Sequence, residues 1–399
     1  MAAATAPVPV RAASALGFPF AAPATDGSLV EVAPGVLWAS MPMPMGLDHV
    51  NVWLLRGDSG WTLVDTGLPT GATRALWERI AAEHLDGLPV QALVCTHFHP
   101  DHAGLAAWLC ERFDVPLYMS RAEFLTMRVL SDGLAGVPHP EQRVFYQRAG
   151  LTAERAERLF ALLRRDPFMP PRQGAFRQLR GGDVLTIGAR RWQVLIGEGH
   201  SPEHVCLYCA EDRLLISGDQ LLPRISSNVL VNANEPEGNP LAQWFESLDR
   251  LDRCEPDTLV LPSHHGVFRG LHARVQELRE HHRRQFDVVR QLLAGCDECT
   301  AVQAMQQLFP RLRGEFDEML ALGETVAHLA CCSTPESCSG GSAPTASTAT
   351  RSHPHRTDRR PTGEGHRTIS RRGAAVAGGQ LPAVDAHPDH QCRDAVERF

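Results

Sequence analysis

Short apolar runs bounded by Gly, Pro and Asp alternate with stretches of helical spacing along most of the chain. Runs of this length and flanking composition are typical of strands joined by tight turns. The predicted strands are 29–32, 36–39, 51–56, 61–65, 90–95, 117–120, 183–187, 191–196, 205–210, 213–217 and 258–261. The predicted helices are 71–85, 103–113, 121–130, 152–165, 241–250, 285–293, 300–308 and 320–329. Strands, helix, strands and helix in this repeated order predict an α/β fold of mixed sheets covered by helices.

Changes in composition along the chain predict its domain organisation. A main domain is expected over 28–270 with a helical insert over 121–178, and a helical module follows over 271–330. Residues 1–27 are rich in Ala, Pro, Gly and Thr, which predicts a disordered N-terminal arm. Residues 331–399 contain six Leu, Ile, Val, Met, Phe, Trp or Tyr, too few to offset the entropy of ordering, so a disordered tail is expected. Two origins of this tail stay open, a natural extension or a reading-frame shift near codon 330.

Composition and charge narrow the class of protein. Hydrophobic residues at 43% and charged residues at 21% are typical of a soluble globular chain, and no apolar stretch of about 18 residues exists to span a membrane. A net charge of -7 argues against a nucleic-acid protein that relies on a broad positive field. The N-terminus lacks a secretory pattern, so we expect a cytoplasmic location.

The eleven cysteines are then expected to stay reduced rather than to form a disulfide framework. Cys206 and Cys209, like Cys296 and Cys299, are spaced as a zinc ribbon would require. However, Cys206 and Cys209 fall in a strand-like run, where residues three apart point to opposite faces. Buried structural thiols are therefore predicted, not a Cys₄ zinc site.

The candidate chemistry lies directly after the apolar run 90–95, where the chain reads Thr-His-Phe-His-Pro-Asp-His. At the end of a strand, His97 and His99 point to the same side, so both imidazoles can face one cation. Asp101 and His102 turn back across the same pocket and offer ligands to a second cation about 3.5–4 Å away. Further candidate ligands follow apolar runs elsewhere in the chain: Asp65, His200, Asp219 and His264.

With these residues the chain resembles the metallo-β-lactamase-fold hydrolases over about 29–330, in the series H-x-H-x-D-H followed by His, Asp and His. The resemblance implies an αβ/βα sandwich of two mixed β-sheets flanked by helices, with the metals at one sheet edge. It also implies two divalent metal ions, Zn²⁺ first, with Fe and Mn²⁺ suited to the same donors. The first metal would be held by His97, His99 and His200. The second would be held by Asp101, His102 and His264, with Asp219 bridging both.

The resemblance extends to three neighbouring positions. Asp65 matches a carboxylate that orients ligands without binding metal. His204 matches a frequent second histidine with a structural role. His265 stands where the family usually has Gly, so either His264 or His265 could coordinate, and position favours His264.

The mechanism that the resemblance implies is hydrolysis by a metal-bridging hydroxide, because two dications lower the pKa of a bound water towards 7. Asp101 is placed to orient this nucleophile and to carry its proton to the leaving group. An Asp at 219, where secreted β-lactamases have Cys, argues against antibiotic hydrolysis as the main task.

Three segments, 218–226, 261–269 and 281–284, are similar to the glyoxalase-II-like/β-lactamase-like protein 2 branch, which carries a C-terminal winged-helix-like module. This implies cleavage of an ester, thioester or lactone of a small acyl substrate. The glutathione-contacting signature of hydroxyacylglutathione hydrolases is not evident, which puts glutathione in doubt. An endoribonuclease or phosphodiesterase acting on single-stranded RNA is the alternative; the lack of a basic stripe disfavours it, and the Arg-rich segment 279–290 keeps it open.

A non-catalytic, metal-stabilised binding protein is a third hypothesis, although it would predict the loss of a ligand and all seven are present. The insert has two interpretations, core packing or a lid over an acyl or aromatic substrate. Its apolar residues are Phe124, Met127, Leu130, Phe145, Tyr146, Phe168 and Met169. The sequence does not predict the oligomeric state.

Overall fold

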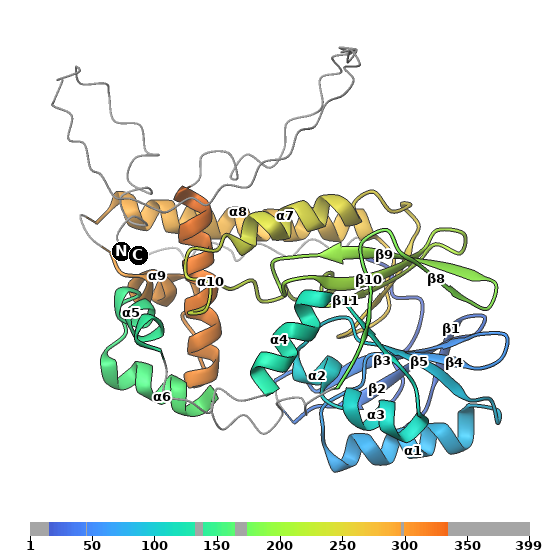
Figure 1. Ribbon diagram of the computed structural model, residues 1–399. Helices are drawn as coiled ribbons and strands as arrows, with labels where there is room; N and C mark the ends of the chain where they lie inside the picture. Colours follow the sequence, from blue (N-terminus) through green and yellow to red (C-terminus); the bar gives the residue numbers. More distant parts are fainter. Residues whose placement is uncertain (1–15, 45, 132–138, 164–173, 297–298, 334–399) are drawn as a thin grey trace, which may run out of the picture.

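The computed structural model describes residues 16–44, 46–131, 139–163, 174–296 and 299–333. Within them the chain forms a seven-stranded and a five-stranded sheet that face each other, with helices on both outer sides (Figure 1). The first sheet runs in order through β1 Val30–Ala33, β2 Val36–Pro42, β3 His49–Arg56, β4 Trp61–Val64, β5 Val90–Val94, β6 Leu117–Met119 and β7 Arg177–Gln178. The second has the order β12 Leu259–Pro262, β11 Leu214–Gly218, β10 His204–Cys209, β9 Arg190–Gly197 and β8 Val184–Ile187.

Both sheets are mixed, as predicted. The first is antiparallel from β1 to β4 and parallel from β4 to β7. The second is antiparallel from β8 to β11, and β12 pairs parallel with β11. This is the predicted αβ/βα sandwich, and most predicted strands agree with the observed ones to within one or two residues.

The helices are α1 Gly71–His84, α2 Pro100–Ala103, α3 Ala106–Phe113, α4 Arg121–Ser131, α5 Pro140–Arg148, α6 Ala153–Leu163, α7 Pro240–Leu251, α8 Leu271–Ala294, α9 Ala301–Leu308 and α10 Glu315–Ser333. Helix α5 was not predicted, although His139 caps it and Pro140 occupies its first turn, where proline is favoured. The helix predicted over 285–293 is wrong in extent, because it is the last part of the 24-residue α8.

Three apolar clusters explain the layers. One lies between the sheets and includes the stacked Trp38 and Trp53, whose ring centroids are 5.9 Å apart. A second packs the outer face of the first sheet against α1, α3 and α4. The third covers the outer face of the second sheet and continues into α5, α6, α8, α9 and α10. Aliphatic and aromatic side chains that alternate along the strands thus supply both faces of each sheet.

Helices α5 and α6 join the C-terminal helices in one helical group, although more than a hundred residues separate them in sequence (Figure 1). The amide of Val302 donates to the carbonyl of Ala149 over 3.0 Å, and Arg158 pairs with Glu315 at 2.9 Å. Gly150 has a φ of +98°, and a Cβ there would lie 2.8 Å from Thr300. Close approach of the two segments therefore depends on glycine.

Of the seven apolar residues predicted to give the insert a hydrophobic face, four are buried in the core: Phe124, Met127, Phe145 and Tyr146. Leu130 is half-buried, and Phe168 and Met169 lie outside the described residues. These four side chains therefore serve core packing and do not line a lid.

At both ends of the described chain, the structure shows ordered residues where disorder was predicted. Within the arm predicted over 1–27, Leu16 is buried, and the backbones of Gly17 and Arg269 exchange hydrogen bonds of 3.2 and 2.8 Å. Helix α10 continues three residues into the tail predicted from 331, and Cys331 is fully buried in the third cluster. The remaining predictions, for 1–15 and 334–399, lie outside the described residues.

The described residues 271–296 and 299–333 contain helices and no strand, so a β-wing is not among them. None of the helices that the structure describes combines the length and the apolar character needed to cross a membrane.

Candidate metal centre

The predicted ligands come from loops that meet at one edge of the sandwich. His97 and His99 follow β5 of the first sheet, while His200, Asp219 and His264 follow β9, β11 and β12 of the second. Strands β9, β11 and β12 run in the same direction, so their carboxyl ends lie at the same edge. The amide of Val205 donates to the carbonyl of Thr96 over 2.8 Å and ties the two sheets together there.

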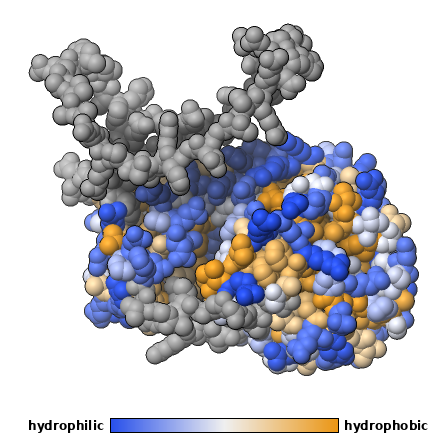
Figure 2. Space-filling model, in the orientation of Figure 1, coloured by the Kyte–Doolittle hydropathy of each residue, from blue (hydrophilic) through white to orange (hydrophobic). Residues whose placement is uncertain are grey.

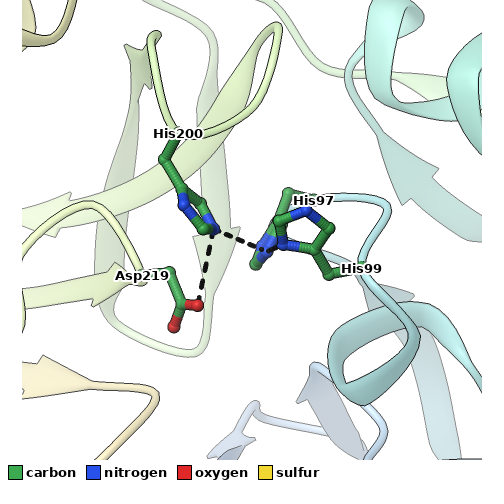
Figure 3. Close-up of side chains that lie close together, drawn as sticks. All are labelled: His97, His99, His200 and Asp219. Carbon is green, nitrogen blue, oxygen red and sulfur yellow. Dashed lines mark hydrogen bonds and ion pairs between the residues drawn. The ribbon is translucent and has the colours of Figure 1, made fainter. Parts of the chain in front are cut away.

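The first cluster consists of His97, His99, His200 and Asp219 (Figure 3). His97 Nε2 lies 2.7 Å from His99 Nδ1 and 3.3 Å from His200 Nε2. His200 Nε2 lies 3.5 Å from Asp219 Oδ2. Nδ1 of His200 is 2.8 Å from the carbonyl of Asn228, to which it donates, so its Nε2 carries a lone pair. Ring nitrogens that converge in this way suit a shared cation.

The second cluster consists of Asp101, His102 and His264. Asp101 Oδ2 lies 3.3 Å from His102 Nε2 and 3.4 Å from His264 Nε2. Asp219 faces this cluster as well, with Oδ1 3.4 Å from His264 Nε2 and Oδ2 3.6 Å from His102 Nε2. Asp219 thus lies between the two clusters, which is the position required of a bridging ligand.

Unsatisfied atoms indicate that the clusters fit divalent cations. His102 Nε2 and Asp219 Oδ1 are buried, and their nearest polar contacts are the long ion pairs of 3.3 and 3.4 Å to Asp101 and His264. Buried polar atoms need close partners, and a cation between these atoms would supply one. The donor set of imidazoles and carboxylates is one that Zn²⁺, Fe and Mn²⁺ accept.

Asp65 orients the imidazole of His102 through the ring nitrogen that faces away from the second cluster. Its Oδ1 accepts from the amide of Thr96 over 2.7 Å, and its Oδ2 lies 2.8 Å from His102 Nδ1. Asp65 has a φ of +63°, an unusual value that places its carboxylate under the loop. A carboxylate on Nδ1 fixes the tautomer of His102 and leaves Nε2 for a metal.

The structure places His264 in the second cluster and His265 outside both clusters. Nδ1 of His264 donates to the carbonyl of His49 over 2.9 Å, which leaves its Nε2 facing Asp101 and Asp219. His265 has a φ of +65°, and its carbonyl accepts from the Asn51 amide over 2.8 Å. The ring of His265 lies beside that of His49, with the two centroids 6.5 Å apart.

His204 lies behind Asp219. Its Nε2 accepts from the Asp219 amide over 3.1 Å, and the ring is fully buried. Gly218 makes room for the ring, because a Cβ there would lie 2.3 Å from His204 Cε1. His204 therefore holds the backbone of Asp219, the residue that lies between the two clusters.

Burial and neighbouring charges lower the pKa of some histidines in the site and raise the pKa of others. Burial and the neighbouring His200 lower the pKa of His99 to about 3, so its ring is neutral at pH 7. Burial alone would lower the pKa of His264, but Asp219 and Asp101 raise it to about 10. Nearby carboxylates also raise the pKa of His102, so His102 and His264 both hold an extra proton. These protons lie where a metal would bind, and metal binding would release them.

Glu123 was missed by sequence analysis. Its carboxylate is fully buried and accepts from the Phe98 amide (3.0 Å), the Ser201 hydroxyl (2.6 Å) and the Glu203 amide (2.8 Å). Phe98 lies between two predicted ligands, and Ser201 follows a third. Burial raises the pKa of Glu123 to about 7, while these hydrogen bonds favour the charged form. Glu123 therefore joins the two ligand loops of the first cluster.

Cysteines take no part in the metal clusters of the described residues. Cys206 and Cys209 are buried in β10, and burial raises the pKa of the Cys206 thiol. This agrees with the burial predicted for this pair, whereas Cys296 is exposed and Cys299 is partly exposed, so the prediction is wrong for the second pair.

Comparison with known proteins agrees with this geometry. Residues 45–264 match the sequence profile of the metallo-beta-lactamase superfamily. The crystal structure of a beta-lactamase domain protein from Burkholderia ambifaria is similar, with 44% identity and a TM-score of 0.69 over 79% of this chain and 91% of that one. The probable metallo-hydrolase YqjP of Bacillus subtilis is 29% identical over 74% of this chain and 91% of its own length. The acyl-coenzyme A thioesterase MBLAC2 of Gallus gallus is 26% identical over 59% of this chain and 79% of its own length.

Proposed function

The chain belongs to the metallo-beta-lactamase superfamily, and from that premise we propose that it cleaves an ester, thioester or lactone bond of a small acyl substrate. The observation that supports hydrolysis is the position of Asp219, whose carboxylate oxygens lie 3.4–3.6 Å from histidine nitrogens of both ligand clusters. Similarity to an acyl-coenzyme A thioesterase favours a thioester within this class. We also propose that the chain belongs to the glyoxalase-II-like branch of this superfamily, which carries a helical C-terminal module.

Two divalent cations would be held by His97, His99 and His200 on one side, by Asp101, His102 and His264 on the other, and by Asp219 between them. When bound, they supply Lewis acidity and a water molecule whose pKa is low enough for hydroxide chemistry at neutral pH. We propose Zn²⁺ as the first choice, with Fe and Mn²⁺ as alternatives, because all three accept His and Asp donors.

Asp101 is the residue that would move the proton in this proposal. Burial would raise the pKa of Asp101, but the imidazoles of His102 and His264 hold it below the usual range. The carboxylate therefore stays charged and can accept a proton from the nucleophile. Transfer of that proton to the departing thiol or alcohol completes the hydrolysis.

Helix α4 offers an apolar surface for the acyl group. Glu123 on this helix contacts the His97–His99 loop, and Leu125 and Val129 on the same helix are 53% and 69% exposed. Residues four apart lie on one helical face, so the two side chains are neighbours. Figure 2 shows apolar surface over the region where Figure 1 places α4. We propose that the acyl chain lies against this exposed face of α4, the helix that carries Glu123.

The pairing of arginines in α8 supports a small substrate over RNA. Arg283 pairs with Glu280 at 2.7 Å and with Asp287 at 2.7 Å, while Arg290 pairs with Asp287 at 3.4 Å. Arginines that are matched by acidic neighbours on the same helix do not form the unbalanced positive stripe on which phosphate binding depends.

The test is hydrolysis by the metal-loaded protein of acyl-coenzyme A, acyl-glutathione, a lactone and single-stranded RNA, with Asp101→Asn as control. We expect turnover of an acyl substrate that Asp101→Asn loses, together with affinity for the second cation, because Asp101 is one of its three proposed ligands. The first cation, held by His97, His99 and His200, should remain. RNA cleavage without acyl hydrolysis would overturn the proposal in favour of a nuclease. A protein that binds two metals and turns over none of these compounds would indicate a binding role.

A further inference from the structure

A second polar cluster lies between α8 and α10, apart from the metal centre described above. The ligand atoms of His281, His282 and Glu324 are all within 4.8 Å of one another. His282 is fully buried and Glu324 is 5% exposed, while His281 is half-buried. Three potential ligands in a helical core are costly unless something compensates them.

A chain of hydrogen bonds determines the tautomer of His282. Nδ1 of His328 donates to the carbonyl of Glu324 over 2.7 Å, so Nε2 of His328 is an acceptor. Nδ1 of His282 lies 3.2 Å from that Nε2 and must be the donor. The remaining nitrogen, Nε2 of His282, then carries a lone pair, and it is buried with no hydrogen-bond partner among the described residues.

This is the arrangement that metal-binding histidines usually show. One ring nitrogen donates to a neighbour, which fixes the ring, and the other is free for the metal. The His281 ring is positioned differently: its Nε2 accepts from the side-chain amide of Gln285 at 3.1 Å and lies 3.5 Å from the Ser226 hydroxyl. A metal bound at this nitrogen would replace the bond from Gln285, whereas His282 already presents a free lone pair.

Glu324 supplies the negative charge. Within the described residues its carboxylate makes no ion pair or hydrogen bond, and burial raises its pKa to about 8. A buried carboxylate without a cation is strongly disfavoured in its charged form. A bound dication would supply the missing partner for this group.

We propose that His281, His282 and Glu324 form a third divalent-cation site, which takes Zn²⁺ or a similar borderline metal. Two imidazoles and one carboxylate match a known zinc donor set, and the half-buried His281 leaves a position for water. The site joins α8 to α10 inside the helical group. Through Ser226 it also contacts the loop that follows Asp219. Its role is to stabilise the packing of these helices.

The test measures metal content and Zn²⁺-dependent thermal stability of the full chain after chelation and reloading with Zn²⁺. Glu324→Gln keeps the shape of the side chain and removes its charge, and His282→Gln removes the orphaned nitrogen. His272→Gln is the matched control, because His272 lies on α8 outside the cluster. We expect Glu324→Gln and His282→Gln to bind one metal fewer per chain than the parent and the control, and to gain less in Tm from Zn²⁺.

Asp219→Ala separates this site from the metal centre. It should lose metal there and keep the equivalent that depends on Glu324, so the two proposals can fail independently. A folded Glu324→Gln protein that binds as much Zn²⁺ as the parent, with the same gain in Tm, would overturn the site. The cluster would then be satisfied by a proton shared between Glu324 and His282.

Discussion

At the scale of single residues, Asp219 is the side chain that both ligand clusters share. Its Oδ2 faces His200 and His102, and its Oδ1 faces His264. Asp219→Ala should therefore lose at least one of two metals from this centre, together with most of the hydrolytic activity. Metal analysis and turnover of the same preparation check this. Full activity with both metals retained would contradict the bridging role.

His264 and His265 are neighbours with different surroundings. The first faces Asp101 and Asp219, and the second belongs to neither ligand cluster. We expect His264→Ala to abolish turnover and to lower metal content. His265→Ala should keep the metals and alter KM or the pH dependence. The opposite pattern in the two variants would show that the ligand is His265.

Glu123 positions two ligand loops through three hydrogen bonds to one carboxylate. In Glu123→Gln one oxygen becomes an NH₂ group, which cannot accept from the Phe98 or Glu203 amide, so one bond is lost. Loss of a group that orients ligands typically weakens metal affinity about 10–100-fold. Titration of the chelated protein with Zn²⁺ measures this, with Glu78→Gln, an exposed carboxylate paired to Arg112, as control. Equal affinities of the two variants would refute the positioning role.

Residue identity and spacing were enough to predict which His and Asp side chains lie together in the two clusters, because each follows an apolar strand or, for Asp101 and His102, lies in the same short loop. Glu123 could not be found in this way. Its partners are 25 and about 80 residues away in sequence, and a single Glu in an amphipathic helix looks like an exposed residue. The roles of the ligands stay predictions until metal content is measured.

At the scale of elements, α4 has two faces with different tasks. Phe124 and Met127 pack into the core, while Leu125 and Val129 are exposed. If the exposed face holds the acyl chain, Leu125→Ser with Val129→Ser should raise KM for long-chain thioesters more than for short-chain ones, with metal content unchanged. A buried CH₂ is worth about 0.8 kcal/mol, so the loss should grow with chain length.

The matched control for this pair is Val144→Ser, which changes an exposed valine on α5. Rates with acetyl, hexanoyl and palmitoyl thioesters would be compared among the three proteins. A uniform effect across chain lengths, or none, would remove α4 from the substrate site.

Strands were predicted more accurately than helices because apolar runs between Gly, Pro and Asp define their ends. The extents of the helices depend more on contacts with distant parts of the chain than on the local sequence. Helix α5 has little apolar periodicity of its own, since Phe145 and Tyr146 are its buried residues. Helix α8 begins well before the predicted 285–293 and includes His281, His282 and the arginines that follow. Contacts with α10 and α7 provide the stabilisation that the local sequence lacks.

At the scale of the whole molecule, the helical group is built from two distant parts of the chain. Residues 140–163 and 271–333 share one apolar cluster with the outer face of the second sheet. Periodicity could predict the separate helices but not this packing, because nothing local indicates which surfaces meet. The group is thus continuous with the sheet that carries His200, Asp219 and His264, and its stability bears directly on the metal centre.

The C-terminal limit of this group gives the last prediction. Ala327, Leu329 and Cys331 on α10 are at most 4% exposed, so this turn of the helix is part of the core. Beyond the helix, 334–399 contains six large apolar residues in all, too few for a further core. Deletion of 334–399 should therefore leave Tm, metal content and turnover unchanged.

Deletion of 327–399 is the matched comparison, because it also removes the buried turn. Loss of one buried leucine alone costs about 2–5 kcal/mol, a large part of the about 5–15 kcal/mol that stabilises a domain. The longer deletion should lower Tm by many degrees and reduce soluble yield, while the shorter one matches the full chain. If the shorter deletion also lost metal or activity, residues after 333 would have to contribute to the fold or the site, and the boundary drawn at the end of α10 would be wrong.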